Sequence, residues 1–439
     1  MNKVSPRILS GFMELLPAEQ IVFNKFLDTI KENYELCGFT PMETPIVELS
    51  EILLAKAGGE TEKQIYRFNK GDNDLCLRFD LTVPFSRFVA MNKNVLTFPF
   101  KRYQIGKVYR GERPQKGRFR EFYQCDVDIV NNDNLDLIYD AEIIATIDTT
   151  ISKLLKIVNI NDFTIKINNR KILSGFLEEL NIQDKTVDIM RIIDKIDKIT
   201  AEEFIQELNE ILNNNEIANK ILNFIKIKEN NQEIISKLKS LKIQNTLFNQ
   251  GVSELEDLLK YLQDFNVENN HFTIDLSIAR GLDYYTGTVF ETNIDNYPEF
   301  GSICSGGRYE NLTEHYTDKK LPGVGMSIGL TRLFDQLRNK NLINPTTNTT
   351  LDYLVVYMSE NEKDYALKIL SLLRKNEIKS DIYTESGKFK SKMNYADKIG
   401  VGNIVIVGED EKAVNELVIK NMTTGEQKKI SINDIKKLK

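Results

Sequence analysis

The chain has 439 residues, which is too long for one ordinary core and predicts two or three domains. Its composition, 41% hydrophobic and 28% charged, is that of a globular protein, and no apolar run approaches the ~20 residues that a membrane span needs. A net charge of -6 argues against capture of nucleic acid by bulk positive charge, so any nucleic-acid partner would need local basic patches. Four scattered cysteines, two histidines and no signal-peptide core predict a cytoplasmic protein without a zinc site or disulfides.

The first expected helix runs from about Ala18 to Cys37. Apolar residues recur there at helical spacing, and Gly38 follows as a stop signal. An extended segment punctuated by Pro41 and Pro45 comes next. Such a helix can simply cover the sheet of its own chain, and the residues by themselves slightly favour that interpretation.

Residues 64–69 and 75–83 are expected to form paired strands around the turn KGDND. Asp80 and Thr82 stand at the end of the second strand, where their oxygens can hold an ammonium group. They fit the N-cap of a helix equally well, since Pro84 would lie in its first turn. The residues leave both interpretations open.

A basic hairpin is expected between Phe100 and Val130. Its loop, RGERPQKGR, lies in a stretch from Lys101 to Arg120 that holds eight Lys or Arg and one acid. Arginine forks suit a polyphosphate, because they meet phosphate oxygens bidentately and keep their charge. The second strand then turns acidic, which suits a substrate cation. A basic hairpin that only steadies a surface or touches nucleic acid nonspecifically is the alternative.

A helix over residues 136–157 and the strand DFTIKIN follow, and then the composition changes. From 171 to 266 the chain is rich in Lys, Glu, Asn, Ile and Leu, contains no proline and keeps helical periodicity. We therefore expect 1–170 to be the first part of a core, 171–266 to be a helical insertion, and 267–337 to complete the core.

The resumed core carries the segment HFTIDLSIARGLDYYTGTVFETNI at residues 271–294. Arg280, Asp283, Tyr284 and Tyr285 lie at its turn, where side chains can converge on a cleft and the tyrosines supply flat walls and hydroxyls. For a bare tyrosine pair, ordinary hairpin packing is the favoured explanation, but it does not account for the whole string. CSGGRYENL and GVGMSIGLTRL follow, the latter leading into a helix that bears Arg332.

A linker by composition covers 338–351, and a separate α/β unit covers 352–439. Its strands and helices alternate, which predicts a mostly parallel sheet covered on both faces. Lys388, Lys390 and Lys392 predict a local basic patch. An α/β unit alone indicates no function.

The hairpin string ERPQKGRFREFYQ closely resembles motif 2 of class II aminoacyl-tRNA synthetases, and RGLDYYTGTVFE resembles the histidine signature of the histidyl-tRNA synthetases. The first helix with its strand is similar to motif 1, the Arg332 segment to motif 3, and 352–439 to an anticodon-binding domain. The resemblance covers nearly the whole chain. It implies an α/β fold with an α+β catalytic core: an antiparallel sheet flanked by helices, a helical insertion near the acceptor stem, and a homodimer formed through motif 1.

The family activates histidine with ATP and then esterifies the 3′ end of tRNA(His). For the ATP subsite the resemblance implies that Arg110 holds the α-phosphate, that Arg280 stabilises charge there, and that Arg113 and Arg332 address the outer phosphates and adenine. Mg²⁺ would bridge the phosphates, with no metal site built from protein residues alone. The resemblance thus assigns the catalytic roles to Arg110 and Arg280.

For histidine, the family pattern implies a subsite built from the acid-x-Thr element, the hairpin and the histidine signature. This chain has Asp-Leu-Thr where bacterial members often have Glu-Gly-Thr, and either carboxylate can hold an ammonium. The residues assigned to the amino group are Asp80, Thr82 and Gln124; those assigned to the imidazole side are Asp128, Tyr284 and Tyr285, with Arg280 at the carboxylate. The rivals are a regulatory subunit of ATP phosphoribosyltransferase, a synthetase for another amino acid, and a tRNA-binding scaffold.

Overall fold

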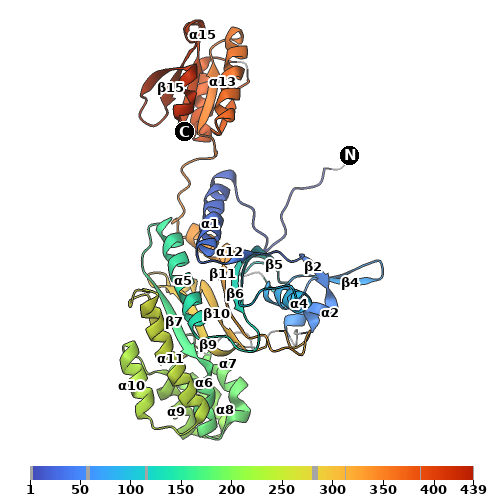
Figure 1. Cartoon of the computed structure of the whole chain (residues 1–439), viewed down its shortest axis with the longest axis vertical. Helices are drawn as coiled ribbons and strands as arrows, with labels where there is room; N and C mark the ends of the chain where they lie inside the picture. The colour runs from blue at the N-terminus through green and yellow to red at the C-terminus, as the bar shows by residue number, and fades with distance from the viewer. Residues whose placement is uncertain are drawn as a thin grey trace. The chain divides into compact units, whose positions relative to one another are not determined.

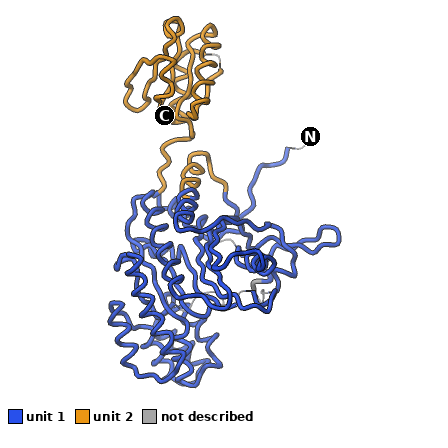
Figure 2. The backbone as a smooth tube through the Cα atoms, in the orientation of Figure 1, with its two compact units in different colours: residues 1–13, 27–342 blue, residues 14–26, 343–439 orange. Residues whose placement is uncertain are grey.

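The computed structural model describes residues 3–55, 60–113, 117–278, 285–311, 313–385 and 387–438. It divides into two compact units, one of residues 1–13 with 27–342 and one of residues 14–26 with 343–439 (Figure 2). The boundary falls within helix α1, Pro17–Leu36. Across the described ranges, no helix combines the length and the apolarity needed to cross a bilayer.

An eight-stranded sheet forms the centre of the first unit (Figure 1). Its order is β1-β5-β6-β11-β10-β9-β7-β8, antiparallel except for the parallel pairs β1–β5 and β7–β8. The strands are β1 (Thr40–Pro41), β5 (Phe100–Tyr109), β6 (Glu121–Val130), β7 (Phe163–Asn169), β8 (Phe272–Ile274), β9 (Tyr285–Ile294), β10 (Cys304–Tyr309) and β11 (Gly323–Gly329). The predicted antiparallel core sheet flanked by helices is confirmed.

The hairpin of β5 and β6 is the best-predicted part of this sheet. Its register runs from Phe100 opposite Val130 to Tyr109 opposite Glu121, so ten consecutive pairs align. β6 then pairs with β11 along seven residues, which joins the hairpin to the rest of the sheet. Side chains alternate between the two faces of a strand, and every second residue of β6 therefore projects toward the same side.

Helix α5 (Ile138–Lys156) covers one face of the sheet and packs on β6, β10 and β11. Its buried residues recur at helical spacing, among them Ile143, Ile147, Ile151 and Leu154. Helix α12 (Leu330–Asn339) continues directly from β11 and packs on β6. The central strands thus have a buried apolar side, which fixes their register.

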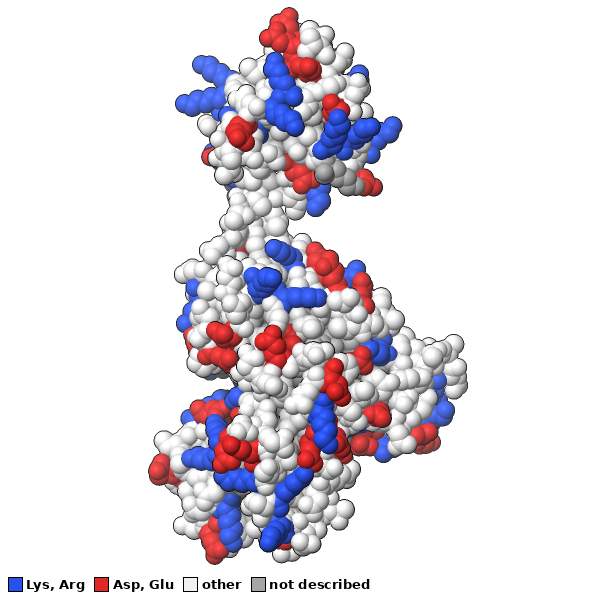
Figure 3. All heavy atoms as spheres, turned by 60° about the vertical axis from the view of Figure 1, so that its left-hand side comes forward, with Lys and Arg blue, Asp and Glu red and all other residues white. Residues whose placement is uncertain are grey.

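The helical insertion follows β7 and ends before β8. Its elements are α6 (Arg170–Glu179), η1 (Gln183–Lys185), α7 (Thr186–Ile193), α8 (Ala201–Leu212), α9 (Asn215–Ile225), α10 (Asn231–Ser240) and α11 (Thr246–Asp264). Helices α6 and α11 approach closely at Gly175 and Gly251, where an added Cβ would meet backbone or side-chain atoms at 2.4 and 2.7 Å. Lys, Arg, Asp and Glu intermix on its surface, as expected of solvated faces (Figure 3).

A small three-stranded sheet, in the order β2-β4-β3, stands between the first helix and the hairpin in sequence. Its elements are β2 (Val47–Leu49), β3 (Arg67–Lys70) and β4 (Asn73–Leu77), with helices α2 (Ser50–Leu54), α3 (Glu60–Lys63) and α4 (Thr82–Asn92). The expected strand 75–83 is therefore too long. It stops at Leu77 because α4 begins at Thr82, with Pro84 in its first turn.

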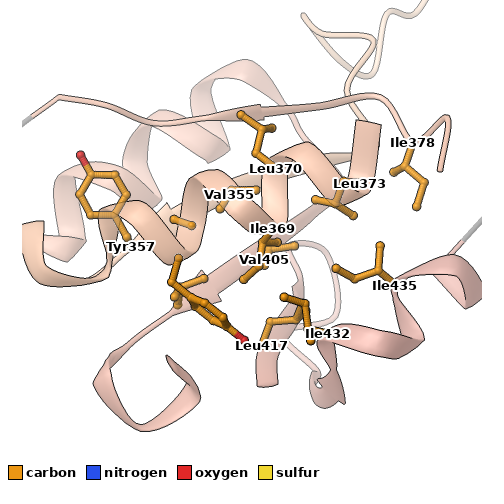
Figure 4. Close-up of a cluster of buried hydrophobic side chains, with 13 residues drawn as sticks. Val355, Tyr357, Ile369, Leu370, Leu373, Ile378, Val405, Leu417, Ile432 and Ile435 are labelled. Carbon is orange, nitrogen blue, oxygen red and sulfur yellow. The ribbon is translucent and has the colours of Figure 1, made fainter. Parts of the chain in front are cut away.

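The second unit contains a five-stranded sheet in the order β13-β12-β14-β15-β16. Its elements are β12 (Tyr353–Tyr357), η3 (Glu360–Glu362), α13 (Lys363–Lys375), β13 (Ser380–Ile382), α14 (Phe389–Ile399), β14 (Asn403–Val407), α15 (Glu409–Val414), β15 (Glu416–Asn421), β16 (Gln427–Ser431) and η4 (Ile432–Leu438). Its core joins β12, α13, β14, β15 and η4 (Figure 4).

Two details of this unit correct the expectations. The sheet is mixed rather than mostly parallel, because β14–β15 and β15–β16 are antiparallel while β12 pairs in parallel with β13 and β14. Lys392 is not part of a surface patch: it is buried, its Nζ donates to Tyr357 O at 2.7 Å, and it lies over the Tyr357 ring. Lys388 and Lys390 are exposed.

Candidate functional site

A cavity of about 590 Å³ lies against the large sheet of the first unit. The hairpin, β9, β10, β11 and the beginnings of α4 and α12 line it, and Asp194 of the insertion reaches it as well. It combines the basic hairpin loop at one end with the acidic strand residues at the other. Both polarities that the sequence predicted on this hairpin therefore open into one space.

Strand alternation arranges the floor of this cavity. Gln124, Asp126 and Asp128 line it from one face of β6. Across from them on β11 stand Gly329, Ser327 and Gly325, in that register. The polar side chains thus come from β6, whereas β11 contributes small residues that leave room above the sheet.

Asp128 is buried within a fixed network. Its Oδ2 lies 2.5 Å from Arg102 Nη2, in an ion pair without hydrogen-bond alignment, and its Oδ1 accepts from the Tyr309 hydroxyl at 3.0 Å. Arg102 is wholly buried over the ring of Phe85, 4.1 Å from the centroid. Burial raises the pKa of Asp128 to about 6, while Arg102 and Tyr309 act in the opposite direction.

Gly325 is required for the position of this carboxylate. A Cβ added there would lie 2.1 Å from Asp128 Oδ1 and 2.8 Å from the backbone oxygen of Val127. Because Arg102 and Tyr309 hold Asp128, the side chain cannot swing aside without losing those contacts. The glycine of the motif-3-like segment thus serves close packing against the carboxylate rather than a turn.

Asp126 is the second buried carboxylate of the floor. Burial raises its pKa to about 7, with smaller opposing effects from Arg102 and from a hydrogen bond to Ser327. The neighbouring charges of Asp128 and Asp80 raise it further. Ser327 Oγ also accepts from Gln124 Nε2 at 3.1 Å, so the side chains of Gln124 and Asp126 meet at one hydroxyl.

Asp80 and Thr82 both line the cavity at the beginning of α4. Asp80 Oδ1 accepts from the backbone N–H of Val83 at 2.9 Å, and Thr82 is the first residue of the helix. The helix-capping interpretation therefore holds for Asp80. It does not displace the ligand interpretation, because the same carboxylate also faces the cavity.

Arg110 and Arg332 line the basic end of the cavity. Arg110 packs over the rings of Phe79 and Phe122, with centroid distances of 4.4 and 5.2 Å, and its Nε donates to Phe79 O at 3.2 Å. A guanidinium held flat between two aromatic rings keeps its outer N–H groups in a set direction.

Arg332 takes its place from the first turn of α12. The backbone N–H of Tyr123 donates to Thr331 Oγ1 at 2.8 Å, which ties the start of the helix to β6. Arg332 Nη2 donates to Phe300 O at 2.8 Å. Arg113, in contrast, is exposed and does not line the cavity, although the loop residues next to it lie outside the described ranges.

The structure describes only some of the histidine-signature residues. Arg280, Asp283 and Tyr284 fall outside the described residues, so their predicted roles stay predictions. Tyr285, the first residue of β9, is half-buried and lines the cavity. Its carbonyl accepts from Arg170 Nη1 at 2.9 Å, a contact from the first helix of the insertion.

Sequence reasoning missed the residues that fix the acidic floor. Arg102, Tyr309 and Ser327 are buried or half-buried, and none was singled out. The hairpin register contains a signal for Arg102, because counting back from the loop places it opposite Asp128. Tyr309 and Ser327 come from strands far along the chain, and no local pattern indicates which residues they meet.

The described part of the chain contains no group of three His, Cys, Asp or Glu residues placed to hold a metal ion. Glu112 and Glu291 line the cavity singly. Mg²⁺ usually keeps several waters and binds through one or two carboxylates plus substrate phosphates. The two carboxylates are donors of the type that supports a magnesium ion held mainly by substrate phosphates.

Comparison with known proteins identifies the family. The family model described as histidyl-tRNA synthetase matches residues 11–333, and the anticodon binding domain model matches residues 352–438. The chain belongs to the histidyl-tRNA synthetase family. A protein named histidine–tRNA ligase from Clostridium tetani is 53% identical over 99% of this chain and 98% of its own length. Another from Clostridium acetobutylicum is 52% identical over 99% and 100%.

Solved structures agree with this membership. The histidyl-tRNA synthetase of Nostoc sp. PCC 7120 superposes with a TM-score of 0.90 at 39% identity, covering 99% of both chains. A structure titled ATP phosphoribosyltransferase regulatory subunit/histidyl-tRNA synthetase, from Bacillus halodurans, gives a TM-score of 0.76 at 18% identity, over 93% of this chain and 99% of that one. At that identity the second likeness concerns the fold alone.

Proposed function

We propose that this chain is a histidine–tRNA ligase, which forms histidyl-adenylate and pyrophosphate from histidine and ATP and then transfers histidine to the 3′ end of tRNA(His). The observation that carries the proposal is a single cavity holding buried carboxylates at one end and fixed arginines at the other. Full-length relatives named for this activity support it. Such chemistry asks the protein mainly for positioning and for neutralisation of phosphate charge.

The acidic end of the cavity is the proposed histidine subsite. Asp80, Thr82 and Gln124 hold the α-amino group, and Asp128 with Tyr285 engages the imidazole ring. Each of these residues lines the cavity. Asp128 Oδ1 and Oδ2 already contact Tyr309 and Arg102, yet each carboxylate oxygen has a second lone pair for a ring N–H. Tyr284 completes this subsite in the proposal.

The basic end is the proposed ATP subsite. Arg110 holds the α-phosphate and Arg332 addresses the adenine and outer phosphates, both from the cavity wall. Arg280 and Arg113 are assigned to the α-phosphate with the histidine carboxylate and to the outer phosphates, by family pattern. Mg²⁺, bound with ATP, would neutralise phosphate charge there.

The remaining parts of the chain are assigned to macromolecular partners. The second unit would bind the anticodon of tRNA(His), and the insertion would contact the acceptor stem. We also propose a homodimer through the α1 and motif-1 region, and a cytoplasmic site of action. The regulatory-subunit alternative explains a histidine-binding cavity, but it does not need arginines at an ATP subsite or an anticodon-binding unit.

Charging of tRNA(His) by the purified protein tests this proposal. Labelled histidine should appear in acid-precipitable tRNA in the presence of ATP and Mg²⁺, and not when either is omitted. An Arg110→Ala variant should lose charging while retaining histidine binding, because it removes the guanidinium assigned to the α-phosphate and leaves the carboxylates assigned to histidine in place. Tight histidine binding with no charging by the wild type would favour the regulatory-subunit alternative.

A further inference from the structure

Two buried acceptor atoms on the cavity floor have no hydrogen-bond partner among the described residues. They are Gln124 Oε1 and Asp126 Oδ1, on the same face of β6. Asp126 is only 3% exposed, and both side chains line the cavity and meet at Ser327. A buried acceptor without a partner costs free energy, so this pair indicates a donor that arrives with the substrate.

Asp128, the other carboxylate on this face of β6, differs from Asp126 in its contacts. Both of its oxygens already contact protein groups, Arg102 and Tyr309. Asp126 Oδ1 has no such contact, although the two carboxylates are only one residue apart on the strand. Of the two, Asp126 is therefore the carboxylate with an oxygen that no described protein group contacts.

Charge and donor number identify the ligand group. Arg102 is the buried cation that lowers the pKa of both Asp126 and Asp128, and Asp80 adds a third carboxylate whose charge raises both. Three carboxylates, Asp80, Asp126 and Asp128, thus interact on this part of the floor. An ammonium group brings a positive charge and three N–H donors, whereas a neutral imidazole brings one N–H. The converging acceptors of Gln124, Asp126 and Asp80 match the ammonium.

We propose that Asp126 contacts the α-ammonium group of bound histidine and exchanges a proton for it, an inference that rests on the proposed function. In the empty cavity, part of the Asp126 population is the neutral carboxylic acid. When the ammonium enters, that acid releases its proton to solvent and the carboxylate accepts an N–H···O hydrogen bond. No covalent bond is made, and the positive charge of the ammonium takes the place of the proton's.

The neighbouring titratable groups do not account for this proton exchange in place of Asp126. Burial raises the pKa values of the Cys304 thiol and the Tyr34 phenol, so both stay neutral near pH 7. Asp128 has the lower pKa of the two floor carboxylates, about 6 against about 7. The charged and polar groups that interact with Asp126 are Arg102 (β5), Cys125 and Asp128 (β6), Asp80 (before α4), Cys304 (β10), Ser327 (β11) and Tyr34 (α1). Glu291 (β9) lines the same cavity.

Calorimetric titration of the full-length protein with three ligands tests the proposal. Histidine and histidinol carry the ammonium, and 3-(imidazol-4-yl)propanoate lacks it. Titrations at pH 7 in phosphate and in Tris, whose ionisation enthalpies differ, count the protons exchanged. Because burial raises the pKa of Asp126 to about 7, the wild type should release a fraction of a proton with the ammonium ligands.

The Asp126→Asn variant should abolish that release and weaken histidine and histidinol binding by about 10- to 100-fold, the range of a hydrogen bond to a charged group. Its affinity for the propanoate should not change. Asp257→Asn, an exposed site on α11 paired with Lys260, is the matched control and should bind all three ligands as the wild type does.

Equal loss of affinity for all three ligands would overturn the ammonium contact, and so would unchanged proton release in the variant. If the variant does not fold, the pH dependence of binding to the wild type tests the proposal instead. The affinity for histidinol should increase between pH 6 and 8 relative to the affinity for the propanoate. Parallel pH profiles for the two ligands would overturn the proposal. Histidine-dependent ATP–pyrophosphate exchange by the wild type tests the proposed function separately.

Discussion

A single methyl group at Gly325 should disable the histidine subsite. In Gly325→Ala the new Cβ would lie 2.1 Å from Asp128 Oδ1, whereas carbon and oxygen in close contact stand about 3.3–3.6 Å apart. The carboxylate would therefore have to move by about 1 Å or more, away from Arg102 and Tyr309. A displacement of about 1 Å at a positioning group can cost on the order of 100-fold in rate.

ATP–pyrophosphate exchange measures this effect. We expect kcat/KM for histidine to fall by about 100-fold while KM for ATP stays near the wild-type value, because the arginine end of the cavity is untouched. Gly402→Ala is the matched control, since no atom lies within 4 Å of its added Cβ. A kcat/KM for histidine within about twofold of wild type would refute the argument that Asp128 is held in place.

Three further outcomes follow from the buried charges. Arg308→Met should lower the free energy of unfolding in urea by about 3–5 kcal/mol, because it strands the buried Asp140, whereas a loss below about 1 kcal/mol would contradict this. Tyr309→Phe should lower the free energy of unfolding by about 1.5–3 kcal/mol, because it removes a hydrogen bond to a buried carboxylate. It should also raise the pKa of Asp128 further, which NMR titration would detect. The folded ligand-free protein holds protons on Asp126 and Asp128 up to about pH 7 and 6, against about 4 unfolded. Between pH 4 and 7 these groups therefore make stability fall as pH rises, and Asp126→Asn should flatten that slope in urea titrations.

Local pattern predicted the elements whose signals are local. The hairpin, the insertion helices and the β12–α13 alternation lie close to their expected positions, because apolar periodicity and breakers define them. The strand expected at 75–83 failed at its end, where Pro84 and the Asp80 cap favour a helix start. In the second unit, the lysine-rich strand β16 carries too few apolar residues to indicate a strand.

The residues of the site likewise include some that local sequence indicates and some that it does not. Gln124, Asp128 and Arg110 could be placed from one hairpin and its resemblance to a family motif. The contact of Asp128 with Tyr309 could not, because 181 residues separate the two in the sequence, whereas Arg102 stands opposite Asp128 within the hairpin itself. Sequence pattern finds the groups that face a cavity, whereas the groups that hold them depend on sheet order and register.

Histidine-dependent ATP–pyrophosphate exchange by the purified protein, compared across the standard amino acids, tests the central claim most directly. Exchange with histidine and with no other amino acid is the expected result, since one cavity joins an acidic floor to an arginine-lined end. Histidine binding without exchange would contradict the ligase assignment and favour a regulatory subunit. Exchange with a different amino acid would contradict the assignment of the acidic floor.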